Sequence, residues 1–446
     1  MKKCVDLSLK SAKVTHFFVF FIFGLMSFTG HFSSKQLGLS SAHANPFFVG
    51  RFNGLLGGPL DHSAFALYWN PANLYTEKID IDLHLGLIGR QASYNRTLPM
   101  EATPEEKSVN GGLATTSALG LVPSIAFHSG IKFNEKNRLG YGAGVYIARA
   151  GTADWDRHPD ASNQYPGAYD GPQRWSALST FMLLVNYSAG ASFESGPFAI
   201  GAAVSYIDTA LSTTKAATAL KTDDLMTEGR IFLDNAKGQE VNATFGANFK
   251  LDDIELGYSW RLPVTYNLKG RAYILYGDAA ETNVKASIEL QVAESHLASA
   301  AYQFDDLRVR LEYERQLWSI MKNQEIRNID KNVELLLLER NFKDTNAYRL
   351  RLDYDLTDKV QLNTGISYEE GVTPQEYHEP GLAEADQVEV GVGLTFPLTT
   401  SLSLHTTFFY QHFFDQTINN SKQSPTTNGD YTDHRQYLTL NLQWSI

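Results

Sequence analysis

The last ten residues of the chain, YLTLNLQWSI at positions 437–446, alternate strictly between polar and apolar side chains. Successive side chains of a β-strand point to opposite faces, so this segment predicts a strand with one wholly apolar face. Comparable segments recur about fourteen times along the chain, each roughly ten residues or longer and separated by turn-forming residues. This repetition is typical of a transmembrane β-barrel, in which the apolar face contacts lipid and the polar face lines the lumen.

The same alternation predicts which charged side chains lie inside the barrel. In the segment 307–318, the odd-numbered positions are mostly apolar and are predicted to contact lipid. Arg308, Arg310 and Glu312 occupy even positions and are predicted to face the lumen, because a charge facing lipid is unfavourable. A large soluble β-sandwich also alternates. The number of strands, the terminal strand and an export signal together favour the barrel.

Short and long connections alternate between the predicted strands. The short turns contain residues that tight turns favour and lie at 134–137, 194–197, 252–253, 305–306, 356–358 and 397–400. The longer loops lie at about 96–119, 151–175, 213–238, 275–283, 320–343, 371–385 and 415–433. Together they connect about fourteen strands, an even number that places both chain ends on one side. This assignment requires one long strand at 284–304.

The N-terminus has the features of an export signal. Several lysines precede an apolar run at 17–28, which is shorter than the roughly 20 residues that a spanning helix needs. Ala42 and Ala44 form a small-x-small cleavage site, so we expect residues 1–44 to be a signal peptide and the mature chain to begin at Asn45. Cys4, the single cysteine, would be removed with it, leaving none for disulfides or a thiolate metal site.

Composition excludes some classes of partner. The formal net charge is −11, and about −15 without the signal peptide, whereas binding to nucleic acid requires a basic surface. The chain has no linker or change in composition after the first strand begins, so we expect 79–446 to form one barrel. The 22 Tyr, 26 Phe and 6 Trp residues fit the aromatic girdles that barrels carry at both membrane interfaces.

Residues 45–78 precede the first predicted strand and lack clean alternation. They contain several glycines and the sequence NPANL at 70–74. In isolation, Asn70, Pro71 and Ala72 indicate a turn before the first strand. Proline restricts φ and asparagine bonds neighbouring backbone, so these residues also suit an irregular segment held inside a barrel.

Several segments resemble one family, the FadL-type long-chain fatty acid transporters of bacterial outer membranes and their relatives for aromatic hydrocarbons. The segments are SAFALYWNPANL at 63–74, and residues 121–148, 251–270, 307–319 and 342–374. The resemblance spans most of the mature chain, but the loops and the immediate N-terminus depart from the family, which leaves the ligand open. It implies an all-β, fourteen-strand antiparallel transmembrane barrel with an N-terminal hatch at 45–78 inside the lumen.

The resemblance also implies a mechanism. Long-chain fatty acids or similar hydrophobic compounds would be captured at outer loops, enter an inner apolar pocket and leave sideways through the barrel wall after the hatch rearranges. Asn70, Pro71 and Ala72 would be the hatch motif. Phe47 and Phe48 would reach the ligand pocket, with a disordered tail as the alternative.

Three glycines on one strand face are candidates for the lateral exit. At Gly140, Gly142 and Gly144 the absence of side chains permits a bend in the wall or close approach of a plug. In the family, the corresponding strand has a kink that opens the exit. Ordinary close packing in the barrel wall is the alternative.

A fatty-acid carboxylate would favour a lumenal arginine, because a guanidinium can bond both carboxylate oxygens. Arg308, Arg310, Arg349 and Arg351 are the inward candidates. Acidic residues accompany them, so a structural ladder of ion pairs is the alternative. Pairing of all four arginines would give more support to a neutral hydrocarbon substrate.

We predict no enzyme activity, cofactor or metal site. His128, His405 and Asp353 are too scattered to indicate a triad, and acidic residues in the loop at 151–175 lack EF-hand spacing. The expected protein is a monomeric transporter of the bacterial outer membrane. Its partners would be a fatty acid or another hydrophobic small molecule, outer-membrane lipid and lipopolysaccharide. An aromatic-hydrocarbon channel, a polar porin, and a hydrolase or adhesin are the rival predictions.

Overall fold

The computed structural model describes residues 57–156, 167, 170–218, 220–276, 282–382 and 384–446. All of these residues belong to one compact unit. The predicted signal peptide at 1–44, the first part of the predicted hatch, and Phe47 and Phe48 lie outside the described residues. In the described part of the chain, no helix combines the length and the apolar character needed to cross a membrane.

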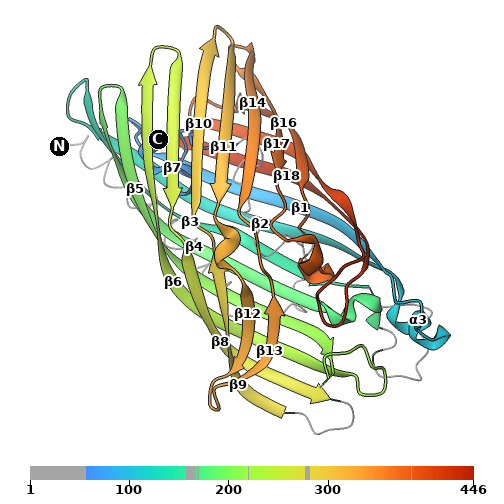
Figure 1. The fold of residues 1–446 in the computed structure, drawn as a ribbon. Helices are drawn as coiled ribbons and strands as arrows, with labels where there is room; N and C mark the ends of the chain where they lie inside the picture. Colours follow the sequence, from blue (N-terminus) through green and yellow to red (C-terminus); the bar gives the residue numbers. More distant parts are fainter. Residues whose placement is uncertain (1–56, 157–166, 168–169, 219, 277–281, 383) are drawn as a thin grey trace. The chain divides into compact units, whose positions relative to one another are not determined.

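Antiparallel strands make up most of the described chain and form one sheet (Figure 1). The strands are β1 (Asp80–Arg96), β2 (Gly112–Lys132), β3 (Asn137–Asp154), β4 (Ser179–Ser195), β5 (Phe198–Ala217), β6 (Gly229–Leu251), β7 (Ile254–Arg261), β8 (Val264–Tyr276), β9 (Thr282–Val292), β10 (Ser295–Phe304), β11 (Leu307–Gln316), β12 (Asn323–Asn328), β13 (Val333–Glu339), β14 (Thr345–Thr357), β15 (Val360–Glu369), β16 (Gln387–Pro397), β17 (Leu402–Ile418) and β18 (Gly429–Ser445). The helical elements are short: α2 (Ala66–Trp69), α3 (Pro104–Asn110), and the 3-10 turns η2 (Pro71–Asn73), η4 (Pro172–Trp175), η5 (Trp318–Ile320), η6 (Gln375–Tyr377) and η7 (Pro380–Leu382).

The sheet closes on itself through its first and last strands. β1 pairs with β2 on one side and with β18 on the other, so that Leu85 lies between Pro123 and Leu440. Four strands of the ring are each interrupted once, so that each consists of two consecutive segments. These strands are β7 with β8, β9 with β10, β11 with β12, and β13 with β14. Counted in this way, the ring contains fourteen antiparallel strands, which confirms the fold class predicted from the sequence.

The two ends of the barrel differ in their connections. Short turns such as 133–136 and 305–306 connect strands at one end, which we call the turn end. Longer segments connect them at the other, the loop end. The hairpins β8–β9 and β12–β13 lie on the loop-end side of the strand interruptions (Figure 1).

Two details at the loop end differ from the sequence predictions. The segment 284–304 is not one strand but two, β9 and β10, separated by Ala293 and Glu294. The adjacent strand is interrupted at the same level beside Pro263, which has no N–H to donate. The predicted loop at 320–343 contains the hairpin β12–β13, whose second strand, VELLLLE, has no alternation to indicate it.

Burial follows the predicted alternation in the transmembrane part of the ring. On β18, Leu438 and Leu440 are exposed on the outward face, while Thr439 and Asn441 are buried on the inward face. Asp82 of β1 is also fully buried. Exposed aromatic side chains lie near the turn end of several strands; they include Phe133, Phe198, Phe304, Tyr354 and Trp444.

The wall contains one local separation, which we call the β2–β3 gap. Pairing between these strands runs from Lys132 and Arg138 only as far as Ile125 and Val145. The next part of β2 contains Pro123, which cannot donate to a neighbouring strand. β3 has a bulge at Ala148, where its register with β4 shifts. Nearer the loop end, the Asp156 N–H donates to the Thr115 carbonyl at 2.9 Å, so the two strands approach again.

We predict that Leu440→Arg destabilises the barrel more than Leu440→Ala does. The arginine would place a charge on the outward face, which costs about 2–4 kcal/mol near the membrane midplane. Reversible denaturant unfolding in lipid vesicles would measure the free energy of unfolding of both variants. Equal losses for Arg and Ala would contradict the assignment of this face to lipid.

Candidate functional site

Residues 57–78, which we call the N-terminal segment, contact inward-facing side chains on separate parts of the ring. The Ala64 N–H donates to the Asp82 carboxylate of β1 at 2.8 Å. Farther around the ring, Arg261 of β7 donates from Nη2 to the Tyr68 carbonyl at 2.8 Å. The segment therefore occupies part of the lumen.

Asn70 joins two stretches of the N-terminal segment to the wall. Its side-chain N–H groups donate to the Pro59 carbonyl at 2.9 Å and to the Ala247 carbonyl of β6 at 3.1 Å. Its Oδ1 accepts from the Ala72 N–H at 3.1 Å and caps η2, which begins at Pro71. Asn70 is fully buried. The predicted hatch motif is thus a set of hydrogen bonds that fixes an irregular backbone against β6.

Two wall glycines provide the space that this motif occupies. A Cβ added to Gly246 of β6 would overlap Oδ1 of Asn70. A Cβ added to Gly201 of β5 would overlap the backbone of Pro71. Any larger residue at either position would therefore displace the N-terminal segment.

The three candidate glycines of β3 have different neighbours. A Cβ on Gly140 would lie 2.5 Å from the Tyr75 nitrogen, and Gly142 also lies against the N-terminal segment. Gly144 instead lies against β2. The bulge of β3 is not at any of these glycines but at Ala148, farther toward the loop end.

Asp61 of the N-terminal segment is held by two lumenal arginines. It forms ion pairs with Arg310 of β11 and with Arg351 of β14, the latter at 3.0 Å. Both arginines also pair with Asp353, at 2.6 and 3.1 Å respectively. Burial raises the pKa of Asp61, but the guanidiniums of Arg351 and Arg310 outweigh this effect and hold the pKa below its usual value. The carboxylate therefore remains charged at neutral pH.

The other two candidate arginines are also paired. Arg308 forms an ion pair with Glu255 of β7, and Arg349 pairs with Glu314 at 2.6 Å. All four arginines singled out as carboxylate ligands thus have carboxylate partners within the protein, as in the structural alternative. We call this group the ionic cluster; its members are Asp61, Glu255, Arg308, Arg310, Glu314, Arg349, Arg351 and Asp353.

A first group of apolar side chains lies between the N-terminal segment and the β2–β3 gap. Phe65 and Tyr68 contact Tyr146 of β3 edge-on, with ring centroids 6.4 and 6.0 Å apart. Ala148 at the bulge belongs to the same group. This inner apolar cluster comprises Ala64, Phe65, Ala66, Leu67, Tyr68, Trp69, Leu74, Ala126, Tyr146, Ala148, Ala203 and Leu297.

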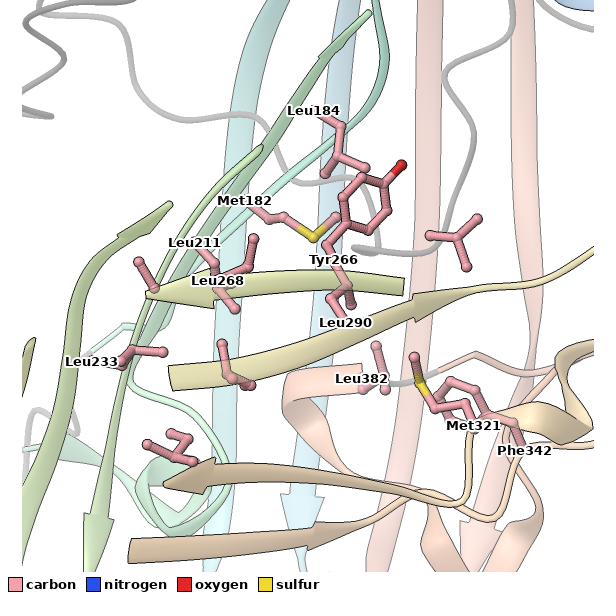
Figure 2. Close-up of a cluster of buried hydrophobic side chains, with 14 of the residues drawn as sticks. Met182, Leu184, Leu211, Leu233, Tyr266, Leu268, Leu290, Met321, Phe342 and Leu382 are labelled. Atoms are coloured by element: carbon pink, nitrogen blue, oxygen red, sulfur yellow. The ribbon is translucent and has the colours of Figure 1, made fainter. Parts of the chain in front are cut away.

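A second, larger group lines the lumen toward the loop end. Figure 2 shows Met182 and Leu184 of β4 near Tyr266 and Leu268 of β8, with Leu290 of β9 beside them. Residues that follow the interruptions complete it, among them Trp318, Met321 and Phe342. The outer apolar cluster therefore draws side chains from strands β4, β5, β6, β8, β9 and β12 and from connecting segments.

Two arginines that form no ion pair with any described residue lie between these clusters. The guanidinium of Arg149 lies 5.3 Å from the ring centre of Trp318 in the outer cluster. Arg149 is 7% exposed, and its Nη1 has no hydrogen-bond partner in the described part of the chain. Arg261 lies 3.9 Å from the ring centre of Tyr68 in the inner cluster. Buried positive charge without a carboxylate partner is unfavourable unless an anion joins it.

Sequence reasoning missed Arg149 because of the bulge in β3. Tyr146 faces inward, and strict alternation would turn the residue three positions later outward. The extra residue at Ala148 shifts the alternation, so Arg149 also faces inward. The signal in the sequence is an arginine within a strand whose nearest acidic residue along the chain, Asp154, is five positions away.

The alternatives based on catalysis or metal binding gain no support from geometry. No group of three or more metal-ligating side chains occurs among the described residues. Nδ1 of His128 lies 3.0 Å from the Leu74 carbonyl, and Nδ1 of His405 lies 3.0 Å from the Thr395 hydroxyl. Asp353 belongs to the ionic cluster, so the three residues have separate partners.

Comparison with known proteins identifies relatives of this fold. A family model described as "Outer membrane protein transport protein (OMPP1/FadL/TodX)" matches residues 57–445. A FadL homologue of Pseudomonas aeruginosa has a similar structure, with a TM-score of 0.73 and 17% identity, covering 91% of this chain and 99% of that one. The Pseudomonas putida toluene transporter TodX follows at 0.68 and 14%, covering 90% and 99%.

A third similar structure is the Ralstonia pickettii toluene transporter TbuX. Its TM-score is 0.62 at 15% identity, covering 91% of this chain and 99% of that one. The search of curated proteins found no match. At these identities the solved structures establish the fold, and the family model establishes the family.

We predict that Gly246→Ala displaces the N-terminal segment and raises ion conductance in planar bilayers. The added Cβ would overlap the Asn70 side chain that fixes the segment. Gly89→Ala is the matched control, because its nearest neighbour, the Gln436 carbonyl, is 4.0 Å away. Heat-modifiable migration would verify that both barrels assemble. An unchanged conductance in an assembled Gly246→Ala barrel would contradict the contact between Asn70 and β6.

Proposed function

Because the chain belongs to the family of outer membrane transport proteins (OMPP1/FadL/TodX), we propose that it takes up long-chain fatty acids or similar acid-bearing hydrophobic compounds. The protein is an outer-membrane barrel of a family that transports hydrophobic compounds. The turn end then faces the periplasm and the loop end faces the outside. The observation that supports an acidic substrate is Arg149, a buried cation with an unused donor between two apolar clusters.

The two clusters and the arginine suit the two parts of such a molecule. An alkyl chain gains roughly 25 cal/mol per Å² of apolar surface removed from water, so the outer apolar cluster would hold the tail. A carboxylate would accept hydrogen bonds from Arg149, and a bond to a charged group contributes about 1.5–3 kcal/mol. Arg261, which faces Tyr68, would add to the positive potential at the same level.

We propose that the N-terminal segment is the described part of a hatch extending over 45–78. Asn70, Pro71 and Ala72 would hold it against β5 and β6, and the ionic cluster would hold it against β11 and β14. Gly140 and Gly142 would allow it to approach β3 closely. A molecule leaving the inner cluster would pass Tyr146 and Ala148 into the β2–β3 gap and enter lipid sideways.

An aromatic hydrocarbon is the second candidate substrate. Two of the similar structures are named toluene transporters, and another is named a monoaromatic hydrocarbon channel. The full pairing of Arg308, Arg310, Arg349 and Arg351 favours this alternative, since none of the four has to meet an anion. A neutral arene would use the apolar clusters without Arg149.

Two further alternatives are less compatible with the lumen. A polar porin requires an open water-filled channel, whereas the N-terminal segment occupies part of this one. An enzyme requires converging reactive groups, and family members are transport channels, so we propose transport without catalysis.

We predict that Arg149→Gln lowers uptake of labelled oleate by about tenfold, because a charge-assisted hydrogen bond is lost. Uptake of hexadecane or toluene should stay within about twofold. Arg149→Lys should restore part of the oleate uptake. Arg327→Gln, at an arginine of β12 that pairs with Glu325, is the control for removing a guanidinium elsewhere in the barrel. Equal effects on oleate and on the neutral compounds would favour the hydrocarbon alternative.

We also predict that Asn70→Ala impairs uptake of every hydrophobic substrate while leaving the barrel assembled. The variant removes the donors to Pro59 and Ala247 and the cap on η2. Uptake assays in cells, with heat-modifiable migration as the assembly control, would measure both effects. Normal uptake in this variant would contradict the proposed hatch role.

A further inference from the structure

Four cations occupy neighbouring positions on the outward face of β6, β8 and β9. In the pairing register, Lys237 of β6 lies directly opposite Lys269 of β8. Two residues farther along β8, Arg271 lies directly opposite Lys285 of β9. We call these four residues the basic patch; β6, β8 and β9 can be followed side by side in Figure 1.

All four side chains point away from the lumen. Each is exposed, whereas the alternate residues of the same strands are buried in the outer apolar cluster. Leu268 and Ala272, which flank the two cations of β8, are fully buried. The patch is therefore a feature of the outer surface and takes no part in the proposed substrate path.

Negative charge within the protein balances the patch only in part, because in the register Asp208 and Glu289 are diagonal neighbours of Lys237 and Lys269. Lys237, Lys269 and Arg271 form no ion pair among the described residues, and the Nε of Arg271 donates to the amide oxygen of Asn283 at 2.8 Å. Asp234 lies opposite Arg271 in the register but forms no ion pair with it. Lys285 lies 3.6 Å from Asp330, a pair of exposed side chains that contributes little.

The like charges that lie directly opposite each other, Lys237 with Lys269 and Arg271 with Lys285, are unfavourable for the protein alone. Like charges directly opposite each other across two strands destabilise a sheet, and here two such pairs are adjacent. The repulsion is relieved when an anion with several oxygens lies over the four cations. Phosphate groups suit this geometry, because each can accept hydrogen bonds from lysine and arginine at once.

The position of the patch along the strands indicates which kind of phosphate-bearing molecule would reach it. Tyr206 of β5 and Val241 of β6 lie opposite each other and are the last large exposed apolar residues of these strands before Lys237. Lys237 lies four residues beyond Val241, which is about 13 Å along the strand. A patch just outside the apolar band lies at the level of lipid headgroups.

From this geometry we propose that the basic patch binds the phosphate groups of lipopolysaccharide in the outer leaflet. The glycolipid would lie against β6, β8 and β9, with its acyl chains on the apolar surface that includes Val241. Binding would stabilise the loop-end hairpin β8–β9, which supplies Tyr266, Leu268 and Leu290 to the outer apolar cluster. The proposal needs only the outer-membrane location and holds for either candidate substrate.

The test compares binding of diphosphorylated lipid A with binding of its dephosphorylated form. The purified full-length barrel in detergent would be titrated with each lipid, and native mass spectrometry would count the lipid bound. The test variant is Lys237→Gln/Lys269→Gln/Arg271→Gln, which changes only exposed side chains. The matched control is Lys136→Gln/Lys250→Gln/Lys359→Gln, which removes three exposed cations at the turn end.

We expect wild type and the turn-end control to bind diphosphorylated lipid A alike and to discriminate against the dephosphorylated form. The patch variant should bind the diphosphorylated form roughly tenfold or more weakly. Its oleate uptake should remain, whereas loss of Arg149 should affect uptake and leave lipid binding unchanged. This contrast separates failure of this proposal from failure of the proposed function.

Three results would overturn the proposal. The first is equal binding by the patch variant and wild type, and the second is no preference for the phosphorylated lipid. The third is competition by inorganic phosphate or by oleate at the concentration at which lipid A binds, which would indicate a simple anion site or a site that attracts substrate.

Discussion

A β-strand inside a membrane has no water to bond its backbone, so its N–H and C=O groups must find partners in neighbouring strands. Pairing of β18 with β1 supplies the last of these partners and closes the ring. Any separation in the wall is therefore costly unless local residues reduce the number of unpaired groups. At the β2–β3 gap, Pro123 has no N–H and the bulge at Ala148 has already broken the register of β3. The gap through which we propose that an apolar molecule enters lipid is thus also a place where separating two strands leaves fewer backbone groups unpaired.

The lumen is divided between charge and apolar surface. The wall residues of the ionic cluster lie on β7, β11 and β14. Two of them, Arg310 and Arg351, pair with Asp61 and so hold one side of the N-terminal segment. The outer apolar cluster lies mainly on β4, β5, β6, β8 and β9, and the inner cluster continues from it to Tyr146 beside the gap. Under the proposed function, a hydrophobic molecule would therefore avoid the charged side and follow the apolar side. Under the same proposal, Arg149, between the two clusters, would bind a carboxylate but not a plain hydrocarbon.

Much of this fold was predictable because lipid imposes a regular pattern on the sequence. The turns, the alternation on β1 and β18, and the approximate number of strands follow from residues that are adjacent in the chain. The hairpin β12–β13 was not predictable, because the leucine run of its second strand carries no alternation. Likewise, Pro263 is visible in the sequence, but its effect on the neighbouring strand at Ala293 depends on the pairing register. Asn70 was identified through its motif, yet the sequence does not contain its partner, the Ala247 carbonyl.

The sequence alone determined that alternate residues face lipid and lumen, and so that charged residues such as Arg310 and Arg351 point inward. This follows from the two-residue period of a strand, which is a property of consecutive positions. Only the tertiary structure decided which of these charges are neutralised. Arg351 meets Asp61, 290 positions away, once the N-terminal segment lies in the lumen. Arg149 is turned inward by a bulge, and its Nη1 has no hydrogen-bond partner among the described residues. Charge compensation depends on the strand register and on contacts between distant segments. The alternation of residues along the sequence specifies neither of these.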